Sequence, residues 1–188
     1  MSEHTRPLPP HQKTIEHMPT LHVGEVPPFD PATWNLRIEG IVQTPRVLTY
    51  AEVRALPSVE STSDFHCVEG WSVLDCTWKG IRVATLCDLV SPLPEGRFVT
   101  FGCDGGYSTS LTFEDVMRPD VLLAWGLNGE ELEPAHGYPL RLVVPHKYVY
   151  KAAKWVRWLK LTEEKELGYW EVRGYHNNAD PWREERRT

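Results

Sequence analysis

The sequence lacks the motifs of several common classes of binding protein. Its four cysteines form neither a CxxC pair nor a zinc-ribbon spacing, which argues against a structural zinc site. Neither GxGxxG nor the GxxxxGK phosphate loop occurs, so a dinucleotide or P-loop site is not indicated. No apolar run approaches the roughly 20 residues of a membrane-spanning helix. We therefore expect no membrane span.

Excess positive charge is also missing. The formal net charge is -6, and an acidic domain repels phosphate backbones, so nucleic acid is not expected as a partner. The N-terminus has neither the apolar core of a secretory signal nor a twin-arginine pair. We therefore expect a cytoplasmic protein whose cysteines stay reduced.

Chain length and proline content predict the domain organisation. A chain of 188 residues suffices for one compact domain with a sizeable core. Seven prolines lie between Pro7 and Pro31 and prevent a long helix there. We predict that residues 1–20 form an extended or partly disordered N-terminal arm, and that residues 21–188 form a single domain.

Hydrophobic patterns predict an α+β, strand-rich fold with short helices. A capping-box sequence starting at Thr49 predicts one short helix. Residues 86–90 fit a helical stripe, and residues 112–117 resemble another capped turn. Asn128-Gly129 lies between two apolar segments and predicts a hairpin with a tight turn. Strands are expected where apolar side chains share one face, at residues 36–42, 59–67, 98–103, 140–144 and 155–161.

The first segment that can carry chemistry surrounds Cys67. This cysteine ends a β-like run and is followed by Gly70, where the chain leaves a sheet. A soft thiolate at such a position can bind a metal ion. A lone cysteine by itself is more often a buried structural residue, because free cysteine is among the most buried residue types.

A basic segment is the second candidate. His136 and Arg141 precede or begin an apolar strand, and Lys154 follows it. Arg141 can bind a phosphate through two hydrogen bonds, and Lys154 can act as a point charge. A solvated basic surface is the alternative interpretation.

Two further segments have weaker signals. Gly105-Gly106 follows Cys103 and Asp104, and it can let the backbone approach a ligand closely, although a plain turn between strands also explains it. Residues 170–177 combine Trp, Arg, Tyr and His. That composition indicates either the rim of a cleft or aromatic packing onto the domain surface.

Together these motifs resemble the catalytic domain of the sulfite oxidase family of molybdopterin enzymes. The sequence looks like the short bacterial members, near the catalytic subunit of the bacterial protein-methionine-sulfoxide reductase. The resemblance implies a molybdenum–molybdopterin cofactor. It covers residues 21–182 and is most specific in His66–Ser72, Leu122–Gly129, His136–Pro145 and Lys154-Trp155.

The resemblance also implies roles for particular residues. Cys67 matches the cysteine whose sulfur binds molybdenum, and Tyr175 matches, more loosely, the tyrosine near the substrate side of the metal. Cys67 and Tyr175 are therefore the expected catalytic residues, with Cys67 as the metal ligand. The resemblance implies that the cofactor is held, besides Cys67, by His22, Cys103, Asp104, His136, Arg141, Ala152, Ala153 and Lys154.

The implied activity is oxygen-atom transfer to or from a small substrate. Sulfite oxidases carry Asn-Arg-Arg after the metal-binding cysteine, whereas Val68, Glu69 and Gly70 follow Cys67 here. A carboxylate near the ligand disfavours a small dianion, so reduction of an S-oxide or N-oxide is expected over sulfite oxidation. The sequence has no CxxCH haem motif and no C-terminal dimerisation domain. We therefore expect a separate electron donor or acceptor protein, and a monomer.

Two other hypotheses stay open at this point. A non-catalytic molybdopterin carrier would bind the cofactor through His136, Arg141 and Lys154 without turnover. A structural zinc protein is the other, because the chain holds four cysteines and eight histidines, although their spacing does not pair.

Overall fold

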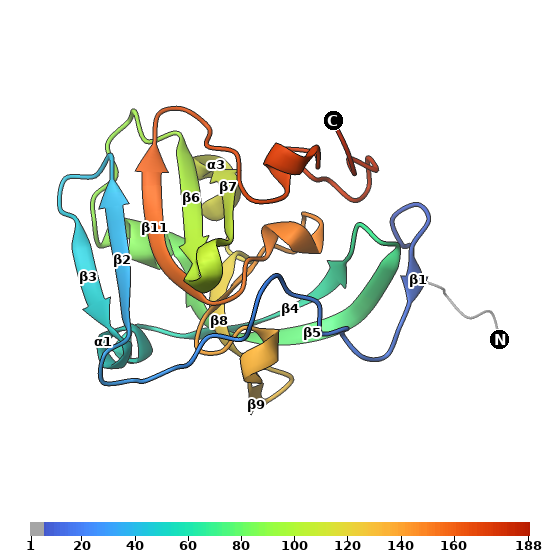
Figure 1. Ribbon diagram of the computed structural model, residues 1–188, viewed down its shortest axis with the longest axis horizontal. Helices are drawn as coiled ribbons and strands as arrows, with labels where there is room; N and C mark the ends of the chain where they lie inside the picture. The colour runs from blue at the N-terminus through green and yellow to red at the C-terminus, as the bar shows by residue number, and fades with distance from the viewer. Residues whose placement is uncertain (1–5) are drawn as a thin grey trace.

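Two β-sheets form the framework of the molecule (Figure 1). The computed structural model describes residues 6–188. The first sheet has the strand order β1-β5-β8-β10, with β4 paired to β5 and β9 paired to β8. Its strands are β1 (Lys13–Thr14), β4 (Val59–His66), β5 (Trp71–Arg82), β8 (Leu122–Leu127), β9 (Glu130–Glu131) and β10 (Arg141–Val143).

The second sheet has the order β3-β2-β11-β6-β7. Its pairs are antiparallel except for β2 with β11, and in the first sheet only β1 runs parallel to its neighbour β5 within the described residues. The strands are β2 (Asn35–Gly40), β3 (Arg46–Thr49), β6 (Phe98–Cys103), β7 (Ser108–Thr112) and β11 (Val156–Thr162).

Short helices connect the strands. The α-helices are α1 (Tyr50–Ala55), α2 (Val83–Asp88) and α3 (Phe113–Val116). The 3-10 helices are η1 (Asp104–Gly106), η2 (Pro134–His136), η3 (Val149–Lys151) and η4 (Glu171–Arg173). Among the described residues, no helix has the length and apolar character needed to cross a membrane.

The main hydrophobic core joins the two sheets. Leu36, Phe101 and Leu159 from the second sheet belong to the same buried cluster as Leu123 and other residues of the first sheet. The first sheet also packs on its other face, where Leu122 and Ala124 belong to a second cluster. Strand β8 is therefore buried on both faces, which explains its continuous apolar sequence.

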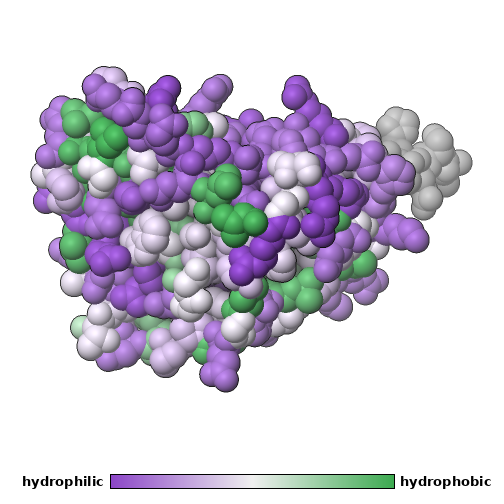
Figure 2. Space-filling model, turned by 45° about the horizontal axis from the view of Figure 1, so that its top comes forward, coloured by the Kyte–Doolittle hydropathy of each residue, from purple (hydrophilic) through white to green (hydrophobic). Residues whose placement is uncertain are grey.

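The surface is mostly polar on the face that Figure 2 shows, with small separate apolar areas. Large apolar side chains that are exposed come from distant parts of the described chain: Leu21, Val47, Met117, Leu167, Val172 and Trp182. Single exposed apolar residues of this kind are ordinary for a folded domain.

The predicted α+β, strand-rich fold is confirmed, and so are several local elements. Strands occupy all five of the predicted segments. Thr49 and Glu52 form the reciprocal capping box at the start of α1, because the Thr49 hydroxyl accepts from the Glu52 amide at 3.3 Å and Glu52 accepts from the Thr49 amide at 2.8 Å. Asn128 and Gly129 have φ angles of 52° and 87°, as the hairpin turn between β8 and β9 requires.

Strands β5 and β7 were not predicted. The pairing of β5 shifts register between Lys79 and Gly80, and Asp75 has a φ of 54°, so its buried positions do not alternate regularly. In β7 the polar Thr109 is fully buried because its hydroxyl donates to Glu171 at 2.9 Å. Both strands depend on partners that are distant in sequence.

The N-terminal arm is held against the first sheet from residue 6 onward. The amides of Lys13 and Ile15 donate to the carbonyl oxygens of Gly70 and Ser72, each at 2.9 Å. Residues 1–5, the tip of the predicted arm, lie outside the described residues. The described part of the arm extends toward the site through residues 18–23.

We predict that Thr49→Ala lowers the free energy of unfolding by about 1 kcal/mol, because it removes the side-chain cap of α1. Urea unfolding monitored by fluorescence measures the change. Ser58→Ala alters an exposed residue near the same helix and serves as the control. Equal stability of Thr49→Ala and Ser58→Ala would contradict a stabilising cap.

Candidate cofactor and active site

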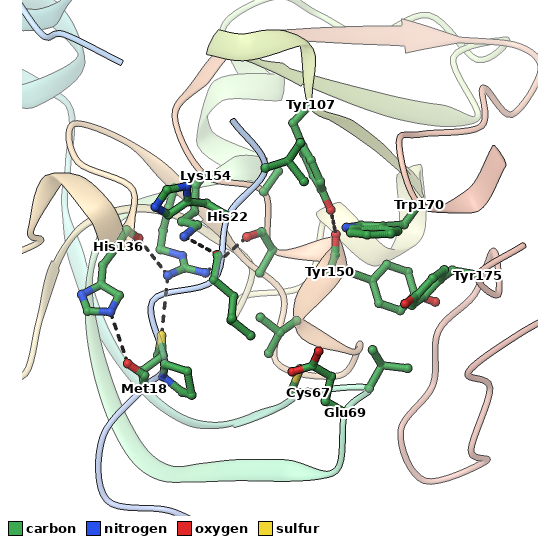
Figure 3. Close-up of a pocket in the computed structure, with 18 of the residues that line it drawn as sticks. Met18, His22, Cys67, Glu69, Tyr107, His136, Tyr150, Lys154, Trp170 and Tyr175 are labelled. Carbon is green, nitrogen blue, oxygen red and sulfur yellow. Dashed lines mark hydrogen bonds between the residues drawn. The ribbon is translucent and has the colours of Figure 1, made fainter. Parts of the chain in front are cut away.

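One cavity brings most of the predicted site residues together (Figure 3). It has a volume of about 310 Å³, within the range of small-molecule sites. It lies between the N-terminal arm, the loop after β4, the segment around η3 and the C-terminal segment. The predicted residues that line it are His22, Cys67, His136, Arg141, Ala152, Ala153, Lys154 and Tyr175.

Cys67 lies in a tight turn between β4 and β5. Its amide donates to the Trp71 carbonyl at 2.8 Å, and its own carbonyl accepts from the Gly70 amide at 3.0 Å. Gly70 has a φ of +99°, a conformation that favours glycine. The turn thus places the Cys67 sulfur at the cavity, beside Glu69 (Figure 3).

A buried polar network fixes the backbone of this turn. Gln12 donates to the Cys67 carbonyl at 2.9 Å and accepts from the Ser72 hydroxyl at 3.0 Å. The same hydroxyl lies 2.7 Å from Nδ1 of His66. All three polar side chains are buried, so the N-terminal arm takes part in positioning the predicted metal ligand.

The Cys67 thiol is only 7% exposed. The pKa of the thiol is raised to about 11, mainly by burial and also by the Glu69 carboxylate, while Arg186 acts in the opposite direction. The sulfur is therefore protonated near neutral pH until a cation binds it, because coordination by a metal removes the proton of a thiol. This environment fits a metal ligand and not a free nucleophile.

Arg141, at the start of β10, is the most unusual charge in the cavity. It is 3% exposed, and among the described residues no carboxylate forms an ion pair with it. It donates to the carbonyl oxygens of His136 at 2.8 Å and Ala152 at 3.3 Å, while its Nε has no hydrogen-bond partner. Burial lowers its pKa to about 10. A buried cation with an unused donor fits an anionic ligand.

Lys154 is the second cation that lines the cavity, and no carboxylate of the described residues pairs with it. Its ammonium group donates to the carbonyl oxygens of Leu21 at 2.6 Å and Ala135 at 2.9 Å. Burial lowers its pKa to about 7, and the neighbouring Arg141 acts in the same direction. An anion bound between Arg141 and Lys154 would compensate both the burial of the Lys154 ammonium group and its repulsion by Arg141.

The N-terminal arm covers this cationic end of the cavity. Nε2 of His136 lies 3.3 Å from the Met18 carbonyl oxygen and 3.2 Å from the Thr20 hydroxyl. The His22 ring packs edge-on against Trp155, with the centroids 5.5 Å apart. His22, His136 and Lys154 lie on the same side of the cavity in Figure 3, opposite Tyr175.

Aromatic side chains form the other wall. Tyr175 packs against Tyr150 and Trp170, with ring centroids 5.2 and 4.9 Å away. The Tyr107 hydroxyl donates to the Tyr150 carbonyl at 2.5 Å. Cys67 and Glu69 lie at the foot of this wall in Figure 3. The cavity therefore has a cationic end and an aromatic end, with the cysteine at the aromatic end.

A buried ion pair holds the aromatic wall together. Lys151 of η3 pairs with Glu171 of η4, and both side chains are at most 1% exposed. Lys151 also donates to the Ser110 carbonyl at 3.1 Å. Since Tyr150 precedes Lys151 and Trp170 precedes Glu171, the pair joins the two segments that supply the wall.

Cys103 and Asp104 do not line this cavity. They lie at a separate, polar depression together with Arg37 and Arg157. Asp104 forms an ion pair with Arg157 at 3.1 Å, and the Cys103 amide pairs with the Tyr107 carbonyl at 2.9 Å. The structure therefore places these two residues at a different depression from the other predicted cofactor ligands.

The lining residues that the sequence analysis did not assign to the site include Met18, Tyr107 and Tyr150. Met18 belongs to an arm without periodicity, and Tyr107 and Tyr150 meet across 43 positions of the chain. Of these three, only Tyr150 had a sequence signal that could have predicted its place at the cavity, because it directly precedes Lys151 and Ala152 in the basic segment.

The family model described as "Oxidoreductase molybdopterin binding domain" matches residues 23–170. The chain therefore belongs to this family of molybdopterin-binding oxidoreductases, as a short member of the sulfite oxidase type. It is an enzyme domain with a molybdenum–molybdopterin cofactor, which confirms the expected cofactor and argues against a non-catalytic carrier.

Individual relatives agree with this assignment. The chain is 40% identical to "Uncharacterized oxidoreductase YuiH" of Bacillus subtilis over 188 residues, which is all of this chain and 95% of that protein. It is 33% identical to "Putative protein-methionine-sulfoxide reductase subunit YedZ1" of Azospira oryzae and 29% identical to "Protein-methionine-sulfoxide reductase catalytic subunit MsrP" of Campylobacter jejuni. Each match covers 81% of this chain, but 58% and 59% of those two proteins.

A solved structure shares the fold. The sulfane dehydrogenase SoxCD from Paracoccus pantotrophus superimposes with a TM-score of 0.72 at 26% identity, over 82% of this chain and 46% of that one.

The cavity fits the cofactor of the family. Arg141, with its unused donor, and Lys154 would hold the anionic part of the cofactor, and the Cys67 sulfur would supply a soft ligand to molybdenum. The bound group supplies two-electron redox chemistry. In the described part of the chain, no three His, Cys, Asp or Glu side chains gather as a metal site, so the zinc hypothesis has no support.

We predict that Lys154→Met changes the pH dependence of stability in the cofactor-free protein. The unfolded chain keeps a lysine pKa near 10.4, whereas the folded value is about 7. Between these values the unfolded state binds the extra proton, so wild-type stability rises with pH. The stability of Lys154→Met relative to wild type should therefore fall between pH 7 and pH 10.

Urea unfolding of cofactor-free protein at several pH values measures this difference. Lys13→Met, which removes an exposed lysine, controls for the loss of a surface charge. If the difference in unfolding free energy between Lys154→Met and wild type stays constant from pH 7 to pH 10, the lowered pKa of Lys154 is contradicted.

Proposed function

We propose that this protein transfers oxygen atoms, and that it reduces S-oxides or N-oxides in preference to oxidising sulfite. The observation that carries the proposal is that Cys67 and the Glu69 carboxylate both line the aromatic end of the cavity. In the balanced reaction, an S-oxide takes up two electrons and two protons and yields a thioether and water. The cofactor supplies the electrons, and the protein supplies binding and orientation.

The division of the cavity supports this function. Arg141 and Lys154 lie at the end that suits the anionic cofactor, so they are not available for an anionic substrate. The end beside Cys67 offers the rings of Tyr150, Trp170 and Tyr175, which suit an uncharged substrate with apolar substituents. Two relatives carry the name of protein-methionine-sulfoxide reductase subunits, which favours the same chemistry.

Tyr175 is proposed as the residue of the chain that contacts the substrate. It lies at the cavity on the aromatic side, together with Cys67. Its hydroxyl can donate a hydrogen bond to an S-oxide or N-oxide oxygen. We further propose that the protein acts as a cytoplasmic monomer that receives its electrons from a separate protein, as the word "subunit" in the names of the relatives suggests for those proteins.

Reduction assays on molybdenum-loaded protein test the proposal. We expect oxidation of a reduced viologen dye when methyl sulfoxides or amine N-oxides are added, and much slower reduction of a dye acceptor when sulfite is added. Sulfite oxidation faster than every oxide reduction would overturn the proposed direction.

We predict that Cys67→Ser loses most bound molybdenum and nearly all activity, because a hydroxyl is a poor substitute for a soft thiolate ligand. Metal analysis of protein purified from a host that makes the cofactor measures the loss. Cys103→Ser is the matched control, because Cys103 is also buried but lies away from the cavity. Wild-type metal content in Cys67→Ser would refute the assignment, and a similar loss in Cys103→Ser would restore Cys103 to the site.

A further inference from the structure

The Glu69 side chain is an unpaired charge at the reactive end of the cavity. It is exposed, lies two residues after Cys67 and points into the cavity in Figure 3. Within residues 6–188, its carboxylate makes no side-chain hydrogen bond or ion pair. The carboxylate therefore has no structural partner that explains its position.

The charges around the cavity are unevenly distributed. Among the described residues that line it, Glu69 is the only one with a carboxylate. Lys154 lies at the opposite end in Figure 3, and so does Arg141, which donates to the carbonyl oxygen of His136 there. Arg186 does not line the cavity, but its positive charge lowers the pKa of Cys67. Its guanidinium group donates to the Val68 carbonyl and lies 5.3 Å from the Tyr148 ring centroid, so it is already engaged.

We propose that Glu69 determines substrate specificity by charge, selecting cationic and neutral oxides over anionic ones. The inference rests on the proposed oxide reduction and names the substrate class within it. Once an anionic cofactor occupies the end with Arg141 and Lys154, the remaining fixed charge that faces a substrate is negative. The Glu69 carboxylate therefore disfavours binding of a negatively charged substrate and favours binding of a positively charged one.

The aromatic wall strengthens this selection. A substrate with a positively charged group near the oxide can place that group against the electron-rich faces of Tyr150, Trp170 or Tyr175. An anionic group meets the same faces and the Glu69 carboxylate, and neither stabilises it. The preferred substrate is therefore an S-oxide or N-oxide that carries a positive charge close to the reacting atom.

Three derivatives of methionine sulfoxide that differ mainly in charge test the proposal. Methionine sulfoxide amide is cationic at pH 7, N-acetylmethionine sulfoxide amide is neutral, and N-acetylmethionine sulfoxide is anionic. In the wild-type holoenzyme we expect kcat/KM to fall in that order. Glu69→Gln should shrink the ratio of cationic to anionic kcat/KM by about tenfold, since the fixed charge contributes about that much at an intermediate dielectric. Glu69→Asp should keep the order.

Molybdenum content and thermal stability of each variant show whether the site is intact. A Glu69→Gln variant that slows all three substrates equally, or leaves their ratios unchanged, would overturn the proposal. Quenching of tryptophan fluorescence on titration with the same three compounds measures their Kd without turnover. If no sulfoxide is reduced, the proposed function fails, while the Kd ratios still decide whether Glu69 selects by charge.

Discussion

The buried guanidinium group of Arg141 is the constraint around which the cavity is built. A charge that is almost fully removed from water must be compensated, and in the described chain this is done by carbonyl oxygens and aromatic faces instead of carboxylates. The rings of Phe65 and Trp78 lie 5.1 and 5.4 Å from it. Gly137 is required beside it, because a Cβ there would lie 2.7 Å from Arg141 Cβ. These contacts compensate the charge of Arg141 only in part, so binding of an anionic cofactor beside it is favoured.

The rest of the site follows from this asymmetry. The cations at one end would hold the anionic part of the cofactor, and the turn after β4 presents Cys67 at the other end, where its sulfur would bind the metal. The turn itself depends on Gln12 of the arm. Parts of the chain before and after the matched family region thus complete the site. His11 and Glu184 join these two parts, with Nδ1 of His11 2.5 Å from a carboxylate oxygen of Glu184.

Local sequence rules predicted the elements that depend on few residues. The capping box at Thr49 and the turn at Asn128-Gly129 depend on neighbours in the chain, and both are confirmed. The long strand β5 escaped prediction because bulges break its alternation and because its partners β4, β8 and β1 supply the missing information. In β7, burial of Thr109 follows from Glu171, which is 62 positions away.

By itself, the sequence determined the family, the cofactor and eight of the residues that line the cavity, because the motifs around Cys67, His136, Arg141 and Lys154 keep their order and spacing. Only the tertiary structure decided which of the predicted residues meet. It placed Cys103 and Asp104 at a separate depression, and it added Met18 and Tyr150 to the cavity. The physical reason is that desolvation and charge compensation depend on distances in space, and positions along the chain do not report them.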